Sequence, residues 1–240
     1  ALPISAATPS QGSHTYNATT GMLSAQYYPL EKTSVYVSYG TGFDTPTLNQ
    51  IFYSPAFLAG TTAINSGNIG LQAARTRQVE AGVKSEIASN VRATFAVFDA
   101  STSDEVVVAL NNGGRSAFGN APKTGRQGAE LSGQLQMPHG WSATLAYTLV
   151  RAKVTQTYTQ FNGVVISDGS RIPGVPGQGL FAELMWRKPD ASMELAVETR
   201  ANGNIAANDI NSEFSGGYAL VNLDRKSTRL NSSHGYISYA

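Results

Sequence analysis

The chain has 240 residues, of which 41% are hydrophobic and only 14% are charged, and it contains no cysteine. Without cysteine it has no disulfide framework and no thiolate metal site. A net charge of +1 is too small to indicate the clustered basic surface that nucleic acids require. No stretch approaches the roughly 20 consecutive apolar residues of a transmembrane helix, which leaves β-strands of about 9–11 residues as the way such a chain would cross a bilayer.

Along the chain, apolar and polar residues alternate with the period of two that predicts β-strands. In residues 34–40, for example, Val35, Val37 and Tyr39 fall on one face, and the other face carries Ser34, Tyr36 and Ser38. A soluble sandwich would direct the polar face to bulk water, whereas a large transmembrane barrel would direct it to the lumen. Alternation alone does not separate these two folds. The alternating segments are residues 21–28, 34–40, 78–84, 128–137, 142–149, 180–187 and 194–201.

The connections between these segments favour the barrel. Short turns on one side and long loops on the other are typical of outer-membrane barrels. The predicted short turns are residues 30–33, 88–90, 138–140 and 189–192, and the predicted long loops are residues 44–76, 111–119, 159–176 and 207–216. Aromatic residues next to the short turns fit either an interfacial girdle or ordinary packing at strand ends. They are Tyr27, Tyr28, Trp141 and Trp186.

Four motifs resemble the C-terminal barrel segment of TonB-dependent outer-membrane receptors, in the family's order and spacing. The first matches a G-F-x-x-P-x-L segment, the second a G-N-P-x-L-x-P-E…E-x-G-x-K segment, the third N-x-G-x…G-x-E-L and the fourth I-P-x-x-P. The second departs from the family at Ile69, Ala73 and Ala74, where Pro, Pro and Glu are usual. The matching residues are Gly42, Phe43, Pro46 and Leu48; Gly67, Asn68, Leu71, Glu80, Gly82 and Lys84; Asn120, Gly128, Glu130 and Leu131; and residues 171–176.

This resemblance implies an all-β fold, namely an antiparallel transmembrane β-barrel fragment with about nine strands of a barrel of ~22. Residues 1–223 would be a partial barrel domain without the plug domain, an open arc whose edge strands carry unpaired backbone groups. The implied location is the outer membrane of a Gram-negative type of cell. The implied function is energy-coupled import of a scarce bulky solute, most simply a ferric siderophore. Its partners would be that chelate, the TonB protein, reached through the plug region, and membrane lipid.

Other classes of function stay open. A passive porin or a structural or adhesive surface barrel would have similar strands, and a soluble β-protein is a further alternative. An enzyme is not expected, because the chain has no G-x-S-x-G, P-loop or H-E-x-x-H motif. No cofactor or metal is expected: His14 and His139 lie at opposite ends of the predicted barrel, and Asp99, Asp104 and Glu105 suit a solvated strand end better than a calcium site.

Candidate binding residues come from the predicted loops and from the predicted lumen face. In the loops, arginine suits an anionic chelate, and aromatic rings suit planar or catecholate ligands. In the lumen, charged residues would contact the plug or line a solvated channel. The loop candidates are Phe43, Asn49, Gln50, Phe52, Tyr53, Arg115, Phe118, Tyr158, Phe161 and Arg171. The candidates facing the lumen or plug are Glu80, Lys84, Glu130, Glu183, Arg187, Glu194, Glu198 and Arg200.

Residues 224–240 break the alternating pattern and are basic and serine-rich. The runs DRKSTRLNSSH and ISYA resemble the translation of a widely used sequencing adapter, with Gly235 and Tyr236 at the variable index bases. We therefore expect the native sequence to end near Leu223 and residues 224–240 to be an adapter-derived tail. A basic strand-and-turn tail is the alternative.

Overall fold

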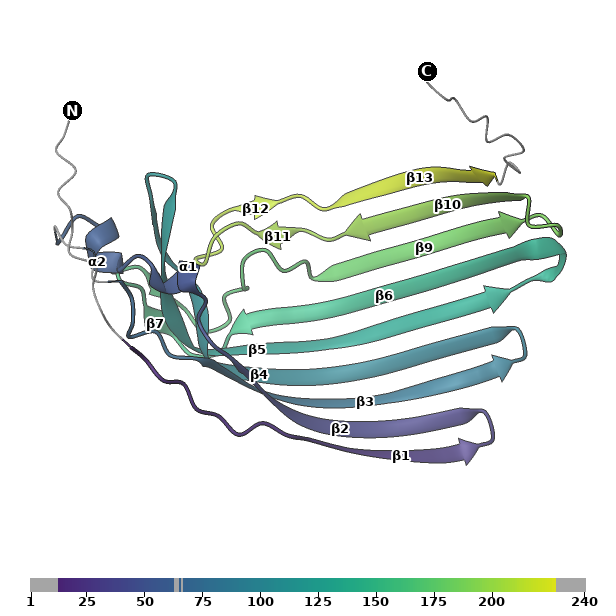
Figure 1. The fold of residues 1–240 in the computed structure, drawn as a ribbon, viewed down its shortest axis with the longest axis horizontal. Coiled ribbons are helices and arrows are strands. Elements are labelled where there is room, and N and C mark those ends of the chain that lie inside the picture. The colour runs from purple at the N-terminus through teal and green to yellow at the C-terminus, as the bar shows by residue number, and fades with distance from the viewer. Residues whose placement is uncertain (1–12, 63–64, 66, 228–240) are drawn as a thin grey trace, which may run out of the picture.

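The computed structural model describes residues 13–62, 65 and 67–227, and its main feature is one antiparallel sheet of nine strands (Figure 1). Neighbouring strands follow each other along the chain, and their order in the sheet is β1-β2-β3-β4-β5-β6-β9-β10-β13. The predicted antiparallel fold with about nine strands is therefore confirmed. The strands are β1 (Met22–Leu30), β2 (Thr33–Asp44), β3 (Ala74–Ala88), β4 (Val91–Asn112), β5 (Arg115–Gln136), β6 (Trp141–Val154), β9 (Gln178–Arg187), β10 (Met193–Asn202) and β13 (Tyr218–Ser227).

The four predicted short turns all lie at one end of the sheet, on the right in Figure 1. One of them contains the 3-10 turn η1 (Pro138–Gly140). The opposite end, which we call the loop end, carries the connection between β2 and β3 and the two small hairpins. Short elements in these loops are α1 (Leu48–Ile51), α2 (Pro55–Leu58), β7 (Tyr158–Thr159), β8 (Val165–Ile166), β11 (Ile205–Ala206) and β12 (Phe214–Ser215).

One predicted loop is wrong. Residues 111–119 do not form a long loop, because β4 continues to Asn112 and β5 begins at Arg115, with only Gly113 and Gly114 between them. These glycines have φ angles of 56° and 74°. Positive φ at both central residues is what a tight type I′ hairpin turn requires, and glycine adopts it without steric cost. The two strands are 22 residues long each, so this hairpin extends beyond its neighbours.

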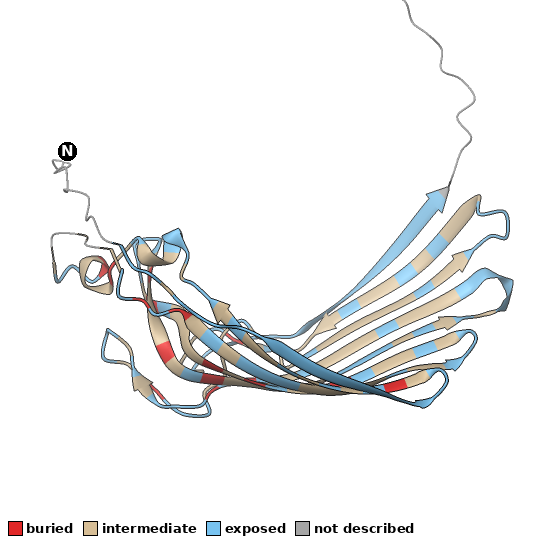
Figure 2. Ribbon diagram, turned by 60° about the horizontal axis from the view of Figure 1, so that its bottom comes forward, coloured by how far each residue is buried: buried red, intermediate tan, exposed pale blue. Residues whose placement is uncertain are grey.

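The strand register separates an apolar face from a polar face of the sheet. Val37 pairs with Ala81, which pairs with Val97, and this row continues to Ala129 and Leu149. Side chains of the apolar face are exposed although they are large and hydrophobic: Val37 is 48% exposed and Leu149 is 44% exposed. Figure 2 shows this exposure repeating along strands of a strongly curved sheet. An apolar face of this extent requires a partner other than water.

Buried side chains of the described residues gather instead toward the loop end. Leu58 of α2 and Leu71 are 6% and 2% exposed, and Ala117 and Ala121 of β5 are fully buried. The loop between β2 and β3 therefore packs against the β4–β5 hairpin and makes a small core there. In the described part of the chain, no helix has the length and apolar character needed to cross a bilayer.

At the C-terminal end, β13 continues past Leu223 to Ser227 and pairs with β10 along its whole length. Lys226 lies opposite Glu194, and Asp224 lies opposite Ala196. The rest of the predicted adapter-derived tail, residues 228–240, lies outside the described residues. The assignment of residues 224–240 to a non-native tail stays a prediction.

Candidate ligand site at the loop end

Three of the predicted loop residues come together next to α2. The Arg115 guanidinium carbon lies 5.4 Å from the ring centroid of Tyr53, whose ring meets that of Phe52 edge-to-face at 4.8 Å. The Tyr53 ring also stacks with that of Phe57, with 6.2 Å between the ring centroids. A cation over an aromatic face is a favourable electrostatic contact. We call Phe52, Tyr53, Phe57 and Arg115 the aromatic–arginine cluster.

Local sequence explains why this cluster forms. Ser54 caps α2 by accepting a hydrogen bond from the Phe57 amide at 3.2 Å, and Pro55 occupies the first turn, where its missing N–H costs nothing. The resulting helical turn brings Phe57 back over Tyr53. Sequence reasoning missed Phe57, although the Ser-Pro pair that starts its helix is a recognisable signal.

Three other predicted residues, Phe118, Tyr158 and Phe161, line a cavity of about 250 Å³ beside this cluster. Pro55 also lines it, so α2 connects the cavity to the aromatic–arginine cluster. Asn68 supports its wall by donating a hydrogen bond to the carbonyl of Phe118 at 2.6 Å. The cavity thus combines aromatic surface with amide groups.

Asn120 fastens the long loop to the strands below this cavity. Its side-chain NH2 group donates to the backbone carbonyls of Gln72 and Asp104 at 3.0 and 2.7 Å, and its side-chain oxygen accepts from the backbone N–H of Gln72 at 2.9 Å. One side chain therefore joins the β2–β3 loop to the β4–β5 hairpin. This is the local reason for an asparagine in the third motif.

Tyr158 has a raised pKa of about 12. Burial is the largest cause and the nearby Asp209 charge adds to it, while the hydrogen bond with Gln160 acts in the opposite direction. Tyr158 therefore stays a neutral phenol at physiological pH. Its side chain thus presents a hydroxyl, and not a phenolate, to the cavity.

The other four loop candidates lie outside this site. Asn49 is exposed on α1, and the Gln50 side chain is used in a capping box with Thr47. Phe43 lies on the apolar face, opposite Arg75. Arg171 donates to the side chain and the carbonyl of Asn204 at 3.2 and 2.8 Å, so it holds two loops together.

The eight predicted lumen residues all lie on the polar face, and several meet across strands. Arg187 binds Glu194 at 2.7 Å, and Arg200 binds Glu198, on its own strand, at 2.7 Å. Glu183 lies opposite Glu198 in the register. Near β2, Glu80 accepts a hydrogen bond from the Tyr36 hydroxyl at 2.6 Å, and the Lys84 ammonium lies 5.0 Å from the centre of the same ring. Glu130 lies opposite Ala96 and Thr148.

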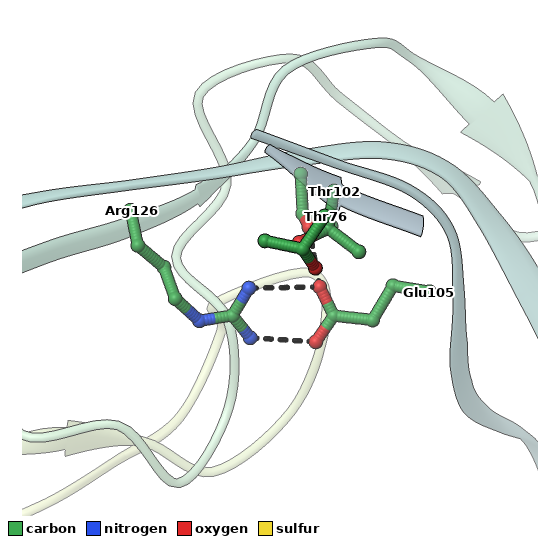
Figure 3. Close-up of polar contacts among 5 residues, drawn as sticks. Thr76, Thr102, Glu105 and Arg126 are labelled. Atoms are coloured by element: carbon green, nitrogen blue, oxygen red, sulfur yellow. Dashed lines mark hydrogen bonds and ion pairs between the residues drawn. The ribbon is translucent and has the colours of Figure 1, made fainter. Parts of the chain in front are cut away.

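Sequence reasoning missed the two-bond ion pair that joins β4 to β5, shown in Figure 3. The Arg126 guanidinium donates two hydrogen bonds to the Glu105 carboxylate, at 2.6 and 3.0 Å, and the Thr124 hydroxyl donates a third. Beside it, Thr76 and Thr102 share a hydrogen bond of 2.8 Å. No sequence spacing predicts this contact, because the pairing of β4 with β5 is needed to bring Glu105 to Arg126.

The possible calcium ligands do not converge. Asp99 accepts a hydrogen bond from Gln127 at 2.6 Å, and Glu105 is occupied by Arg126. Within residues 13–62, 65 and 67–227, no three His, Cys, Asp or Glu side chains gather in the way a metal ion would require.

The fold and its two faces define a piece of an antiparallel β-barrel with an elaborated loop end. Residues 4–230 match the family model for "TonB dependent receptor-like, beta-barrel". The chain therefore belongs to the TonB-dependent receptor family. The predicted family is confirmed.

Solved structures with a similar fold are receptors and transporters. The siderophore receptor PiuA from Acinetobacter baumannii aligns with a TM-score of 0.65 at 16% identity, covering 90% of this chain and 30% of that one. The copper transporter OprC aligns with a TM-score of 0.64 at 12% identity, with coverages of 86% and 30%. The ferric yersiniabactin uptake receptor FyuA from Yersinia pestis aligns with a TM-score of 0.61 at 19% identity, with coverages of 86% and 29%. The chain thus spans about 30% of these proteins' lengths, and at these identities the likeness shows the fold.

Proposed function

We propose that this chain is part of an outer-membrane receptor that imports a scarce, bulky solute by TonB-dependent active transport, and that the solute is a ferric siderophore. Membership of the TonB-dependent receptor family supports the transport class. The siderophore receptors among the similar folds support the ligand class, and the copper transporter supplies the competing ligand to test.

In this proposal, residues 1–223 belong to the C-terminal part of a barrel of ~22 strands, and TonB acts through a plug domain outside this chain. The polar face lines the lumen, where the charged residues of β3, β5, β9 and β10 contact the plug. The apolar face meets membrane lipid. Long outer loops capture the solute, and no covalent chemistry is involved.

The observation that carries the ligand class is the aromatic–arginine cluster beside the 250 Å³ cavity. Arg115 at the tip of β5 provides a positive charge for an anionic chelate, and the Tyr53 face provides a stacking surface for a planar one. The neutral hydroxyl of Tyr158 provides a hydrogen bond in the cavity. Aromatic surface with a few directed polar groups is typical of small-molecule sites.

Uptake of radiolabelled ferric siderophores by cells carrying the complete receptor tests this proposal. We expect Arg115→Gln to raise the apparent Kd about tenfold, because the charge and its contact with the aromatic ring are lost. Lys32→Gln, which removes an exposed charge at the short-turn end, is the matched control and should leave uptake unchanged. Uptake that persists after the proton gradient is collapsed would instead indicate a passive porin. Transport of copper ions without any ferric chelate would contradict the ligand class.

A further inference from the structure

Five basic side chains interrupt the apolar face close to the loop end. They lie at the same level of the sheet, because Arg77 pairs with Ser101, Ser101 with Gly125, and Gly125 with Lys153. Toward the short turns, this face presents Val79 of β3, Val97 of β4 and Leu149 of β6, and Asp99 of β4 on the same face accepts a hydrogen bond from Gln127. We call the five residues the basic belt: Arg75, Arg77, Lys123, Arg151 and Lys153.

The basic belt differs from three arginines of the polar face in having no carboxylate partner. Arg126, Arg187 and Arg200 each hold a carboxylate within 2.7 Å. Within the described part of the chain, no member of the basic belt makes an ion pair, and all five are exposed. Arg75 donates a hydrogen bond of 3.4 Å to the carbonyl of Asn17. These positive charges are therefore available to an anionic partner.

Part of the belt surrounds a hollow. Arg75, Arg77 and Lys123 line a cavity of about 410 Å³, and no acidic residue lines it. In the register, Ser103 lies between Arg75 and Lys123, and Ser101 lies opposite Arg77. Both serines line the cavity, and their hydroxyls add hydrogen-bond donors. Three cations around two hydroxyls suit a phosphate group, to which arginine donates two parallel hydrogen bonds.

The height of the hollow identifies the source of the phosphate. On β6, the apolar face runs from Trp141 to Leu149, and the next residue on this face is Arg151, about 33 Å along the strand from Trp141 at 3.3 Å per residue. Barrel strands are tilted by about 40°, so this length corresponds to a height of about 25 Å across the membrane. The apolar band of an outer-membrane barrel is also about 25 Å tall. The basic belt therefore lies at the depth of lipid headgroups in one leaflet.

We propose that the cavity formed by Arg75, Arg77 and Lys123 binds the phosphates of a membrane glycolipid of the outer leaflet, with Arg151 and Lys153 extending the contact along the sheet. This inference rests on the membrane location in the proposed function, but not on the identity of the imported solute. The lipid would hold the receptor at a fixed depth and would cover the side of the loop end.

Native mass spectrometry of the complete, detergent-solubilised receptor with lipid A tests this proposal. We expect the triple variant R75Q/R77Q/K123Q to bind lipid A about 100-fold more weakly than the wild type. The reason is that each basic side chain at an anionic membrane surface increases the affinity by a factor of about five. The matched control removes three cations near the short turns, K32Q/R92Q/K188Q, and should bind like the wild type. Lipid A treated with a phosphatase should bind weakly to all three proteins.

A second variant tests whether weaker binding by the triple variant results from misfolding. Ser101→Glu keeps every cation and adds a carboxylate to the residues that line the cavity, so it should also weaken lipid A binding. Equal binding by the wild type and both variants would overturn the proposal, as would equal binding of dephosphorylated lipid or complete displacement of lipid A by inorganic phosphate. Ferric siderophore uptake is measured in parallel: a wild-type receptor that binds lipid A but imports no chelate contradicts the proposed function and leaves the lipid site standing.

Discussion

At the scale of single residues, two aromatic rings of the polar face lie directly over glycines of the neighbouring strand. Tyr36 lies opposite Gly82, and Phe98 lies opposite Gly128. A Cβ atom at Gly82 would come within 2.7 Å of the Tyr36 ring, and one at Gly128 within 2.5 Å of the Phe98 ring. Glycine is therefore required at these positions for a close approach by a ring. Such aromatic–glycine pairs cover backbone that would otherwise be bare and help to fix the register.

Gly82→Ala should destabilise the receptor by about 1–3 kcal/mol, because the added methyl group collides with a ring that its hydrogen bond to Glu80 holds in place. Urea unfolding followed by tryptophan fluorescence measures this free energy. Gly21→Ala is the control, since a Cβ there meets nothing within 4 Å, and we expect a change within about 0.5 kcal/mol. Equal midpoints for the two variants would show that the ring moves aside freely.

At the scale of elements, the β4–β5 hairpin is the support of the candidate ligand site. It carries Arg115 at its tip, Phe118 in the cavity and Asn120 against the long loop. Below them, Asp104 has a φ of 57°, which interrupts the regular alternation of β4 next to Glu105. The Glu105–Arg126 contact then joins the two strands beyond the apolar band. This contact stiffens the β4–β5 hairpin where it extends beyond the adjacent strands β3 and β6.

A double-mutant cycle of Glu105→Gln and Arg126→Gln should give a coupling free energy of about 1–2 kcal/mol, less than the 3–5 kcal/mol lost when a fully buried pair is broken. The value is intermediate because the Arg126 and Glu105 side chains are 31% and 19% exposed. The more exposed pair Lys32–Glu86, at 3.6 Å, serves as the comparison and should couple by about 0–1 kcal/mol. If both cycles give the same small coupling in urea unfolding, the contact does not stabilise the hairpin.

The strands and short turns were predictable because they depend on local patterns. Alternation identifies the face of each residue, so every predicted lumen residue lies on the polar face. The tight turn at Gly113 and Gly114 was missed although the Asn-Asn-Gly-Gly run is a signal for a type I′ hairpin. Partners across strands, such as Glu105 with Arg126, follow from the register, and one sequence does not give the register. Contacts between loop residues are harder still to predict from the sequence: Phe52, Tyr53 and Arg115 come together, whereas Arg171 joins other loops.

At the scale of the whole molecule, the curved sheet has two faces that require different surroundings (Figure 2). The polar face carries paired charges and hydroxyl groups, which suit a hydrated interior. The apolar face carries exposed leucine, valine and aromatic side chains and ends at the basic belt. The two sheet edges, β1 and β13, have no further strand beside them among the described residues. A lipid-facing barrel segment accounts for all of these features together.

The central measurement is a comparison of the two faces of β6 in the complete receptor, reconstituted in a bilayer. These 240 residues contain no cysteine, so a thiol introduced in β6 is the only one in this part of the receptor and can be labelled with a fluorophore once any cysteine elsewhere is replaced. Labels at Leu145 and Leu149, on the apolar face, should be quenched by nitroxide-bearing lipid tails, whereas labels at Thr144 and Thr148 should be quenched by water-soluble iodide. Quenching by iodide at all four positions, with no effect of the lipid nitroxides, would contradict a membrane-spanning sheet and favour a soluble β-protein.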